Sequence, residues 1–422
     1  MREMKDSGIA WVGMIPSHWL SKPIGALFQE IRTKNTLGKE KQALQFKMGS
    51  IVPKDNFDAD IEDYVANTIT NYTLVDYGTI MINGLNLNFD FVTQRVALVK
   101  DKGAITSAYM AIKAKDCDEI LPEYSTYILK TYDNCKAFHN MGGGVRKILN
   151  FDELRRCYII VPPIDEQEKI VTFLDEKCSE IDSLIADVQA QIETLEQYKR
   201  STIIETVFKG LNPVLPIKDS SIDWIEEIPA HWNTHPLYYY FTERKNANAL
   251  GQEHNLLSLS YGKIVRKDIN TNGGLLPNNF NTYNIIEKDD IVLRLTDLQN
   301  DKRSLRTGIA RERGIITSAY VTLRAIKPLN AQYFYYLLHA YDLLKVLYNM
   351  GSGVRQGLNY EELSKMMLIE PSLDEQNEIV EYLDKKCSEV DACISDKKEQ
   401  IATLEAYKKS IVFEYVTGKK EI

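Results

Sequence analysis

The stretch DEQEKIVTFLDEKCSEID at residues 165–182 recurs as DEQNEIVEYLDKKCSEVD at residues 374–391, with 12 of 18 positions identical. Four other blocks recur in the same order along the chain. They are DSGIAWVGMIPSHW (6–19) with DSSIDWIEEIPAHW (219–232), ITSAY (105–109) with ITSAY (316–320), MGGGVRKILNFDEL (141–154) with MGSGVRQGLNYEEL (350–363), and QIETLEQYK (191–199) with QIATLEAYK (400–408). Because five blocks in constant order do not arise by chance, the chain is an internal duplication with a repeat of about 210 residues.

The recurring stretch predicts one long helix in each copy. Residues 164–209 contain no Gly or Pro, acidic residues fill the first turn, and Gly210 and Gly418 follow the two segments, as glycines do at helix C-termini. Apolar residues recur at alternating spacings of four and three, which is the seam pattern of a coiled coil. The predicted seam consists of Leu174, Cys178, Ile181, Ile185, Val188, Ile192 and Leu195 in the first copy and of Leu383, Cys387, Val390, Ile394, Ile401 and Leu404 in the second, where Lys397 interrupts it.

Two similar seams in one chain are expected to pair with each other. A twofold repeat most simply places its copies about a pseudo-dyad, so the predicted pair is an antiparallel intramolecular coiled coil. Heptads alone leave dimerisation between chains open. A helix over residues 164–209 is ~69 Å long at about 1.5 Å per residue, which matches roughly two turns of B-DNA at about 34–36 Å each. The pair is therefore a candidate spacer between two globular domains.

The net acidity of the chain is concentrated in the predicted helices. The formal net charge is −8, yet residues 1–160 and 213–370 each carry +1, while residues 161–212 and 371–422 carry −6 and −4. Balanced globular segments can still hold a basic face, so the total charge does not exclude a nucleic-acid partner. The sequence has no apolar run long enough to span a bilayer, no secretory signal, and six cysteines without metal-ligand spacing. It therefore predicts a reduced, cytoplasmic protein.

No arrangement of residues in the sequence predicts catalysis or metal binding. There is no G-x-x-x-x-G-K-[ST] phosphate loop, no G-x-G-x-x-G after a strand, and no Asn-Pro-Pro-Tyr-type motif of an amino-methyltransferase. The carboxylate-rich runs lie on the heptad helices, where a solvated face is the simpler interpretation. His18 and His231, which stand beside Trp19 and Trp232, are interpreted as packing residues.

The two copies differ most in their interior, at residues 56–102 and 269–313. Each interior contains a short predicted strand followed by a polar stretch, and the two stretches align without a gap. Arg, Gln, Asn and Asp have the donor and acceptor geometry that reads base edges in the major groove, although a polar stretch is often only a surface loop. The candidate DNA-binding residues are Asn83, Asn86, Asn88, Gln94 and Arg95 in the first copy and Arg294, Asp297, Gln299, Arg303 and Arg306 in the second.

A glycine-rich block in each copy is a second candidate for DNA contact. Residues 141–146 and 350–355 follow an aromatic, helix-like stretch and precede a predicted strand that leads into the long helix. Backbone amides of such a loop together with an arginine suit a phosphate, whereas the alternative is a tight turn that needs positive φ. The candidates in these blocks are Gly144, Arg146 and Lys147 in the first copy and Gly353, Arg355 and Gln356 in the second.

Three of the repeated motifs resemble the specificity subunit of type I restriction-modification systems. They are a W-x-G/E-x-IP-x-HW opening, a G-x-G-V-R loop and a PP-[IL]-x-EQ-x-x-I helix start, and the resemblance spans residues 6–210 and 219–418. The second copy departs from the pattern only at Glu226 and at Pro371-Ser372. In the first copy the pattern is carried by Trp11, Ile15-Pro16, His18-Trp19, Gly144-Val145-Arg146 and Pro162-Pro163-Ile164-Asp165-Glu166-Gln167.

The resemblance implies two α/β (α+β) target-recognition domains, at residues 1–163 and 213–371, each followed by a long conserved helix, at residues 164–212 and 372–422. It implies a non-catalytic subunit that directs a complex to a bipartite, asymmetric DNA target, with each domain reading one half-site. The implied partners are double-stranded DNA, two methyltransferase subunits that use S-adenosylmethionine to methylate adenine, and two motor-nuclease restriction subunits that use ATP and Mg²⁺. No cofactor is expected in this chain itself.

Two other functions are compatible with parts of the pattern. A coiled-coil scaffold whose globular domains bind protein partners is the main alternative, because heptads alone do not distinguish a spacer from a scaffold. A stand-alone nuclease or methyltransferase is disfavoured by the missing catalytic motifs.

Overall fold

The computed structural model of the chain describes residues 2–47, 49–54, 69–142, 147–269, 279–298, 305–350 and 357–422. It divides into two compact units. The first comprises Met1–Gln189 with Lys398–Ile422, and the second comprises Ala190–Lys397. Each unit holds one globular domain and one half of each long helix, whereas the sequence pattern alone sets each long helix apart as a segment of its own.

The two long helices are α5 (Ile164–Lys209) and α8 (Leu373–Val416), and both agree closely with the ranges expected from the sequence. Acidic residues occupy the first turn of each helix, where they interact favourably with the helix dipole. Gly210 and Gly418 follow the last turns with φ of +73° and +67°, a left-handed conformation that glycine adopts without steric cost. Local sequence therefore accounts for where both helices end.

In the first unit, the N-terminal half of α5 packs against the C-terminal half of α8. Lys408 Nζ lies 2.6 Å from Asp182 Oδ1, and the ring centroids of Phe173 and Tyr415 are 4.4 Å apart. Because the residue numbers rise along one helix and fall along the other, these two halves are antiparallel.

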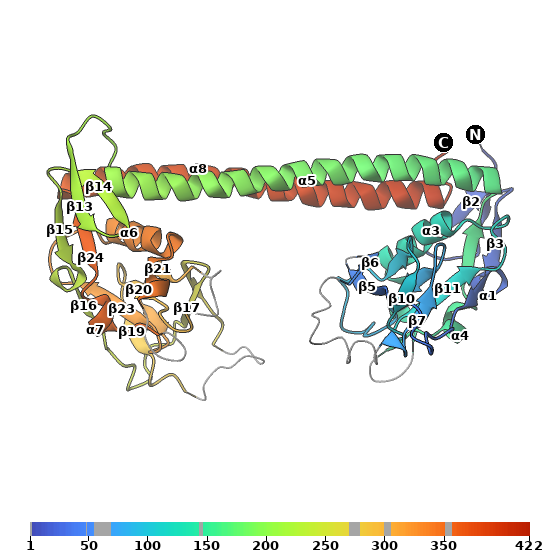
Figure 1. The fold of residues 1–422 in the computed structure, drawn as a ribbon, viewed down its shortest axis with the longest axis horizontal. Coiled ribbons are helices and arrows are strands. Elements are labelled where there is room, and N and C mark those ends of the chain that lie inside the picture. The colour runs from blue at the N-terminus through green and yellow to red at the C-terminus, as the bar shows by residue number, and fades with distance from the viewer. Residues whose placement is uncertain are drawn as a thin grey trace. The chain divides into compact units, whose positions relative to one another are not determined.

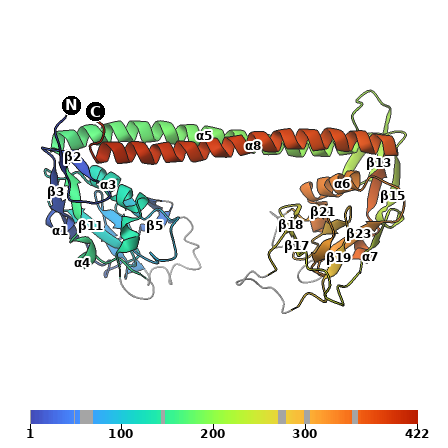
Figure 2. The ribbon, with the colours of Figure 1, turned by 180° about the vertical axis from the view of Figure 1, so that it is seen from behind.

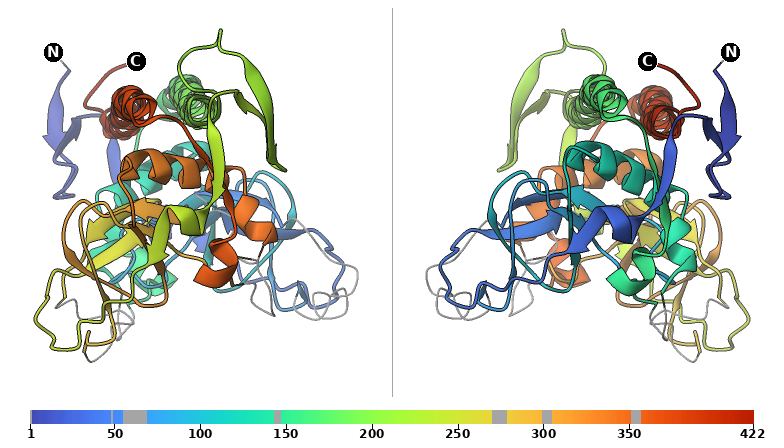
Figure 3. Two further views of the ribbon diagram at one scale, coloured as in Figure 1. Left: turned by 90° about the vertical axis from the view of Figure 1, so that its left-hand side faces the viewer. Right: turned by 90° about the vertical axis from the view of Figure 1, so that its right-hand side faces the viewer.

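In the second unit, the C-terminal half of α5 packs against the N-terminal half of α8. Lys199 Nζ lies 2.6 Å from Asp391 Oδ1, and Val207 and Leu383 belong to one hydrophobic cluster. These halves are therefore antiparallel as well. The end-on views show α5 in green beside α8 in red (Figure 3).

The predicted seam residues of the long helices are all buried or half-buried. The buried group is Leu174, Cys178, Ile181, Val188, Ile192, Leu383, Val390 and Ile394. The half-buried group is Ile185, Leu195, Cys387, Lys397, Ile401 and Leu404.

The globular part of the first unit is built from short strands and a few short helices. The strands are β1 (Met4–Asp6), β2 (Met14–Pro16), β3 (Leu20–Pro23), β4 (Phe28–Glu30), β5 (Ala43–Lys47), β6 (Ser50–Pro53), β7 (Thr73–Val75), β8 (Ile80–Ile82), β9 (Val96–Leu98), β10 (Gly103–Ile105), β11 (Met110–Ala114) and β12 (Tyr158–Val161). Two four-stranded sheets have the orders β4-β11-β8-β9 and β6-β5-β10-β7, and two pairs join β1 to β2 and β12 to β3. The helices are α1 (Ile24–Leu27), α3 (Pro122–Asn134), the 3-10 helix η2 (Ala137–Asn140) and α4 (Phe151–Leu154).

The second unit repeats most of this arrangement. Its strands are β13 (Ile217–Ile222), β14 (Ile225–Pro229), β15 (Asn233–Pro236), β16 (Phe241–Glu243), β17 (Leu257–Ser260), β18 (Lys263–Arg266), β19 (Asn284–Ile286), β20 (Ile291–Leu293), β21 (Thr307–Ile309), β22 (Gly314–Ile316), β23 (Val321–Ala325) and β24 (Met367–Glu370). The four-stranded sheet β16-β23-β20-β21 corresponds to β4-β11-β8-β9, and the pairs β13-β14 and β15-β24 correspond to β1-β2 and β12-β3. In place of a second four-stranded sheet, this unit has the two pairs β17-β18 and β19-β22. The helices are η3 (Leu237–Tyr239), α6 (Ala331–Leu343), η4 (Val346–Asn349) and α7 (Tyr360–Leu363).

One helix in each unit connects the sheet to the long helices. In the first unit α3 packs on β9, and the hydroxyl of Tyr124 donates to the carbonyl of Val416 near the end of α8 at 3.1 Å. The ribbon shows α3 beside this end of α8 (Figure 2). In the second unit α6 packs on β21 (Figure 1). The hydroxyl of Tyr333 donates to the carbonyl of Val207 near the end of α5 at 3.4 Å. Each domain is therefore attached to the C-terminal end of the long helix from the other copy. No helix in the described part of the chain is both long enough and apolar enough to cross a membrane.

Candidate nucleic-acid interface

A polar loop joins β8 to β9 in the first domain, and a buried arginine supports it from inside. The guanidinium of Arg95 donates hydrogen bonds to the carbonyls of Asn83 at 2.9 Å, Leu85 at 2.7 Å and Asp90 at 2.6 Å. The Arg95 side chain has no exposed surface. Because a guanidinium stays charged, its burial is tolerated only where acceptors satisfy its N–H groups. Arg95 therefore fixes the shape of the loop.

Arg306 supports the equivalent loop between β20 and β21 of the second domain. Its guanidinium donates to the carbonyls of Arg294 at 3.2 Å, Thr296 at 2.7 Å and Asp297 at 3.1 Å, and to the hydroxyl of Tyr348 at 3.0 Å. This side chain also has no exposed surface. The two loops share one internal support although most of their other side chains differ.

An aspartate on the neighbouring helix anchors each arginine. The backbone N–H of Arg95 donates to Asp133 on α3 at 2.8 Å, and that of Arg306 donates to Asp342 on α6. Burial raises the pKa of both aspartates, although the hydrogen bonds that they accept oppose this shift. Each loop is therefore hydrogen-bonded to the helix, α3 or α6, that connects its domain to the long helices.

The structure corrects two of the DNA-binding candidates. A direct DNA contact does not fit Arg95 or Arg306, because their side chains are enclosed and their terminal guanidinium nitrogens donate to carbonyls of the loops. Both arginines are reassigned to loop support. Asn86 and Asp297 occupy equivalent turns with φ of 54° and 57°, a left-handed conformation that Asn and Asp tolerate better than most residues.

The structure brings the polar loop of the first domain beside the end of the glycine-rich block. The N–H of Leu87 donates to the carbonyl of Lys147 at 3.1 Å, and the N–H of Lys147 donates to the side chain of Asn88 at 3.3 Å. In the second domain, the N–H of Leu358 donates to the carbonyl of Leu295 at 2.9 Å. In each domain, the polar loop is therefore hydrogen-bonded to a residue that follows the glycine-rich block and is distant in the sequence.

The remaining candidates fall into three groups. Asn86 and Gln94 are exposed. The half-buried candidates are Asn83, Asn88, Lys147, Arg294 and Asp297. The candidates outside the described residues are Gly144, Arg146, Gln299, Arg303, Gly353, Arg355 and Gln356.

Three apolar side chains at the tip of the first loop were missed by reasoning that searched for polar residues. They are Phe89, Phe91 and Val92, and all three are exposed. The gapless alignment of the two copies was the available signal. In it, Phe89, Phe91 and Val92 correspond to the polar or charged residues Asn300, Lys302 and Arg303.

The repeated His-Trp pair binds the first turn of the long helix that follows it. In the first copy, Trp19 Nε1 donates to Glu166 at 2.9 Å, and His18 contacts the same carboxylate. In the second copy, Trp232 Nε1 donates to Glu375 at 3.1 Å, and a ring nitrogen of His231 lies 2.8 Å from that carboxylate. Both tryptophans are buried, whereas both histidines, which the sequence analysis interprets as packing residues, are partly exposed and make polar contacts instead.

Gln167 and Gln376, the residues after these glutamates, bind the domain on the other side. The side chain of Gln167 accepts the N–H of Leu121 at 2.9 Å, just before α3, and that of Gln376 accepts the N–H of Asn330 at 3.0 Å, just before α6. The repeated Glu-Gln motif is therefore a structural clamp between each domain and its long helix.

We expect replacement of Glu166 by Gln to make the stability of the chain less dependent on pH. Burial raises the pKa of Glu166, but hydrogen bonds from His18, Trp19 and Arg2 outweigh it and hold the pKa below its ordinary value of 4.5. A carboxylate with a lowered pKa stabilises the fold above its ordinary pKa and loses this effect as the pH falls. The variant should be less stable at pH 7 by about 1 kcal/mol, with a smaller difference below about pH 4.

Chemical denaturation of the full chain across this pH range measures the effect. The exposed neighbour Glu168, replaced by Gln, is the matched control and should change stability little at any pH. A Glu166→Gln difference that stays constant with pH would contradict the assignment of this ionised clamp.

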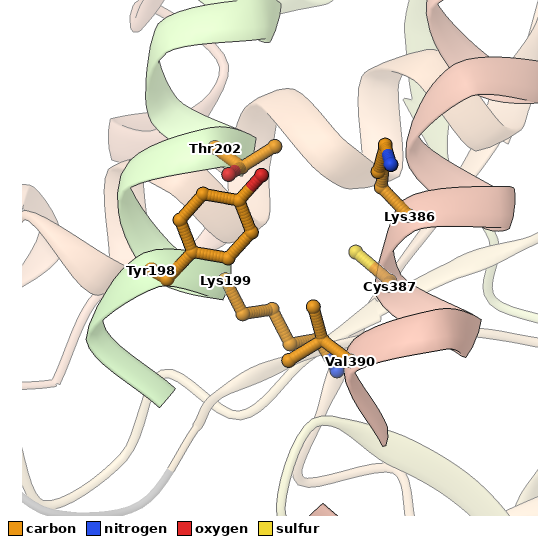
Figure 4. A pocket seen from close by; sticks show the side chains of 6 residues that line it. All are labelled: Tyr198, Lys199, Thr202, Lys386, Cys387 and Val390. Carbon is orange, nitrogen blue, oxygen red and sulfur yellow. The ribbon is translucent and has the colours of Figure 1, made fainter. Parts of the chain in front are cut away.

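The described residues contain no group of three or more His, Cys, Asp or Glu side chains placed to bind a metal ion. A pocket between α5 and α8 of the second unit leaves no room for a water molecule (Figure 4). Burial raises the pKa of the Cys387 thiol in this pocket, which disfavours the reactive thiolate. The pocket is lined by Tyr198, Lys199, Thr202, Lys386, Cys387 and Val390.

Comparison with known proteins relates this architecture to one family. The family model described as the type I restriction modification DNA specificity domain matches residues 32–194 and 253–406. A relative from Methanocaldococcus jannaschii, named as the MjaX type I restriction enzyme specificity subunit, is 23% identical over 97% of this chain and 95% of its own. The MjaVIII type I restriction enzyme specificity subunit of the same organism is 24% identical over 75% of this chain and 74% of its own.

The fold agrees with that relationship. A solved structure described under the complex assembly and conformational transition of the type I R-M system covers 96% of this chain and 99% of its own, with a TM-score of 0.68 at 14% identity. At that identity the likeness concerns the fold alone. The family model matches well over half of the chain, in both copies of the repeat. The chain therefore belongs to the family of type I restriction-modification DNA specificity proteins.

Proposed function

We propose that this chain is the DNA-specificity subunit of a type I restriction-modification complex, in which each globular domain reads one half of a bipartite, asymmetric target. The observation that carries the proposal is the pair of loops at residues 83–95 and 294–306. An equivalent buried arginine, Arg95 or Arg306, supports each loop, while most of the other side chains of the two loops differ. Two unlike half-sites require a common scaffold that presents different side chains to the bases.

In this proposal, catalysis belongs to the partner subunits. Two methyltransferase subunits bind S-adenosylmethionine and methylate adenine, and two restriction subunits use ATP and Mg²⁺ to cleave DNA. The chain itself contributes the DNA contacts. Its long helices form an antiparallel coiled-coil spacer about a pseudo-twofold axis, and their acidic surface is offered to the methyltransferase subunits.

The test is to replace residues 56–102 by a second copy of residues 269–313. If each interior reads one half-site, both domains of the variant read the same sequence. Because the domains are proposed to be related by a twofold axis, the methylated motif should become palindromic. Methylome sequencing of cells that express the variant with its methyltransferase subunit measures this directly.

The matched control exchanges residues 191–199 with 400–408 on the long helices and should leave the motif unchanged. An unchanged asymmetric motif after the interior replacement would refute the proposal. So would a protein that methylates no defined motif with its partner subunits.

A further inference from the structure

The loop at residues 83–95 presents apolar side chains at its tip. Phe89 is 72% exposed, Phe91 is 54% exposed and Val92 is 92% exposed. Single exposed apolar residues are common on protein surfaces, but three within four residues form a patch, and such patches mark interaction sites. The tip is therefore a candidate contact surface.

The tip is braced at its backbone. Arg95 and His139 both contact the carbonyl of Asp90, at 2.6 and 3.0 Å, and Lys136 Nζ donates to the carbonyl of Phe91 at 2.6 Å. The rings of Phe91 and His139 stack with centroids 4.8 Å apart. Because the backbone is fixed at both residues, Phe89 and Val92 are kept in water and do not fold back onto the domain.

The acidic residue within the tip is turned toward the loop. The Asp90 carboxylate accepts the N–H groups of Thr93 at 2.9 Å and Val92 at 3.1 Å, and it lies 3.5 Å from the Arg95 guanidinium. Hydrogen bonds from Thr93 lower the pKa of Asp90 to about 2, so it stays ionised and bound within the loop. Its charge is largely balanced there, which reduces repulsion of a phosphate backbone.

The surroundings of the tip are polar, and the equivalent position in the other copy carries cations. The exposed amide side chains of Asn86 and Gln94 flank the tip. In the gapless alignment Val92 corresponds to Arg303, which lies outside the described residues. A cationic side chain suits phosphates and guanine edges and does not suit an apolar groove on a protein. DNA is the partner that accepts both kinds of tip.

We propose that Phe89 and Val92 are specificity-determining residues that make apolar contacts with the 5-methyl groups of thymine in the half-site bound by the first domain. Thymine is the base that presents a methyl group in the major groove, and apolar side chains recognise it there. The inference rests on the proposed function and extends it, because it names the base and the kind of contact.

The experiment replaces thymine by uracil, which removes only the methyl group. The full complex of this chain with its methyltransferase subunits is titrated with duplexes that carry its methylated motif, with each thymine of both half-sites replaced in turn. We expect at least one replacement in the half-site of the first domain to weaken binding by about fourfold, the value of one buried methyl group. The same replacement should have no effect on a Phe89→Ala, Val92→Ala double variant.

Two controls make the outcome decisive. The Val214→Ala variant removes another highly exposed valine, 86% exposed and outside the tip, and should keep the wild-type response to uracil. Thermal unfolding of the double variant should match the wild type, because neither side chain is buried. The inference is overturned if uracil has no effect at any position, or if the double variant binds DNA normally and loses only its methyltransferase subunits. Either result leaves the proposed function standing, whereas absence of any methylated motif would refute that function itself.

Discussion

Replacement of Arg95 by Met removes the internal support of the 83–95 loop, and we expect the free energy of unfolding to fall by about 3–5 kcal/mol. Three loop carbonyls lose their donor, and the nearby carboxylate of Asp133 is left buried without its guanidinium neighbour. A buried charge without its partner destabilises a fold more than loss of a surface pair does. Chemical denaturation of the full chain measures the change, and methylation of the target by the assembled complex should be lost with it.

Arg32→Ala is the control for this variant. The Arg32 side chain is 77% exposed and pairs with Glu30 at the surface, so its removal should leave the stability nearly unchanged. An Arg95→Met protein that unfolds like the wild type but no longer directs methylation would show that Arg95 contacts DNA and that its reassignment to loop support is mistaken.

Replacement of Trp232 by Ala should destabilise the second unit by about 3–5 kcal/mol. Trp232 is 1% exposed and lies in the main core of this unit. Its ring packs against the C-terminal end of α5, where a Cβ added to Gly210 would lie 3.1 Å from the ring. Its Nε1 donates a hydrogen bond to Glu375 at the start of α8. One side chain therefore attaches the domain to both long helices, and its loss leaves a large cavity at that junction.

His231→Ala separates packing from the polar contact at the same place. The His231 side chain is 47% exposed and binds the same Glu375, so its loss should cost less than about 1 kcal/mol. Denaturation midpoints of the two variants and the wild type, measured side by side, decide the matter. Equal losses would mean that the polar clamp, and not the buried indole, holds the domain on the helices.

The long helices illustrate what local sequence can predict. Their extent follows from an uninterrupted run of helix-forming residues, acidic first turns and terminal glycines, all of which act within a few residues. The seam residues could be predicted from the spacing of apolar residues along the chain alone. The polar clamps could be predicted only in part. The repeated His-Trp and Glu-Gln motifs showed that these residues recur. Nothing in the sequence indicated that Trp19 contacts Glu166, which is almost 150 positions away.

The candidate interface shows where sequence reasoning fails. The composition of the loops drew attention to their polar residues, so every arginine in them was interpreted as a possible DNA contact. Burial decides between a contact and a support, and burial depends on neighbours that are distant in the chain. Arg95 is enclosed because Asp133 on α3 and the carbonyls of its own loop surround it.

The duplication, the two long helices and the segments in which the copies differ could all be predicted from the sequence, because repeats and helix periodicity depend on residues that are close together in the chain. Which side chains of the loops are exposed to solvent could not be predicted in this way, because it depends on the folded structure around them. The tertiary structure encloses the charged Arg95 and exposes the apolar Phe89 and Val92, the reverse of what polarity alone predicts. The physical reason is that a guanidinium can be buried where carbonyls satisfy it, and a braced backbone can keep apolar side chains exposed.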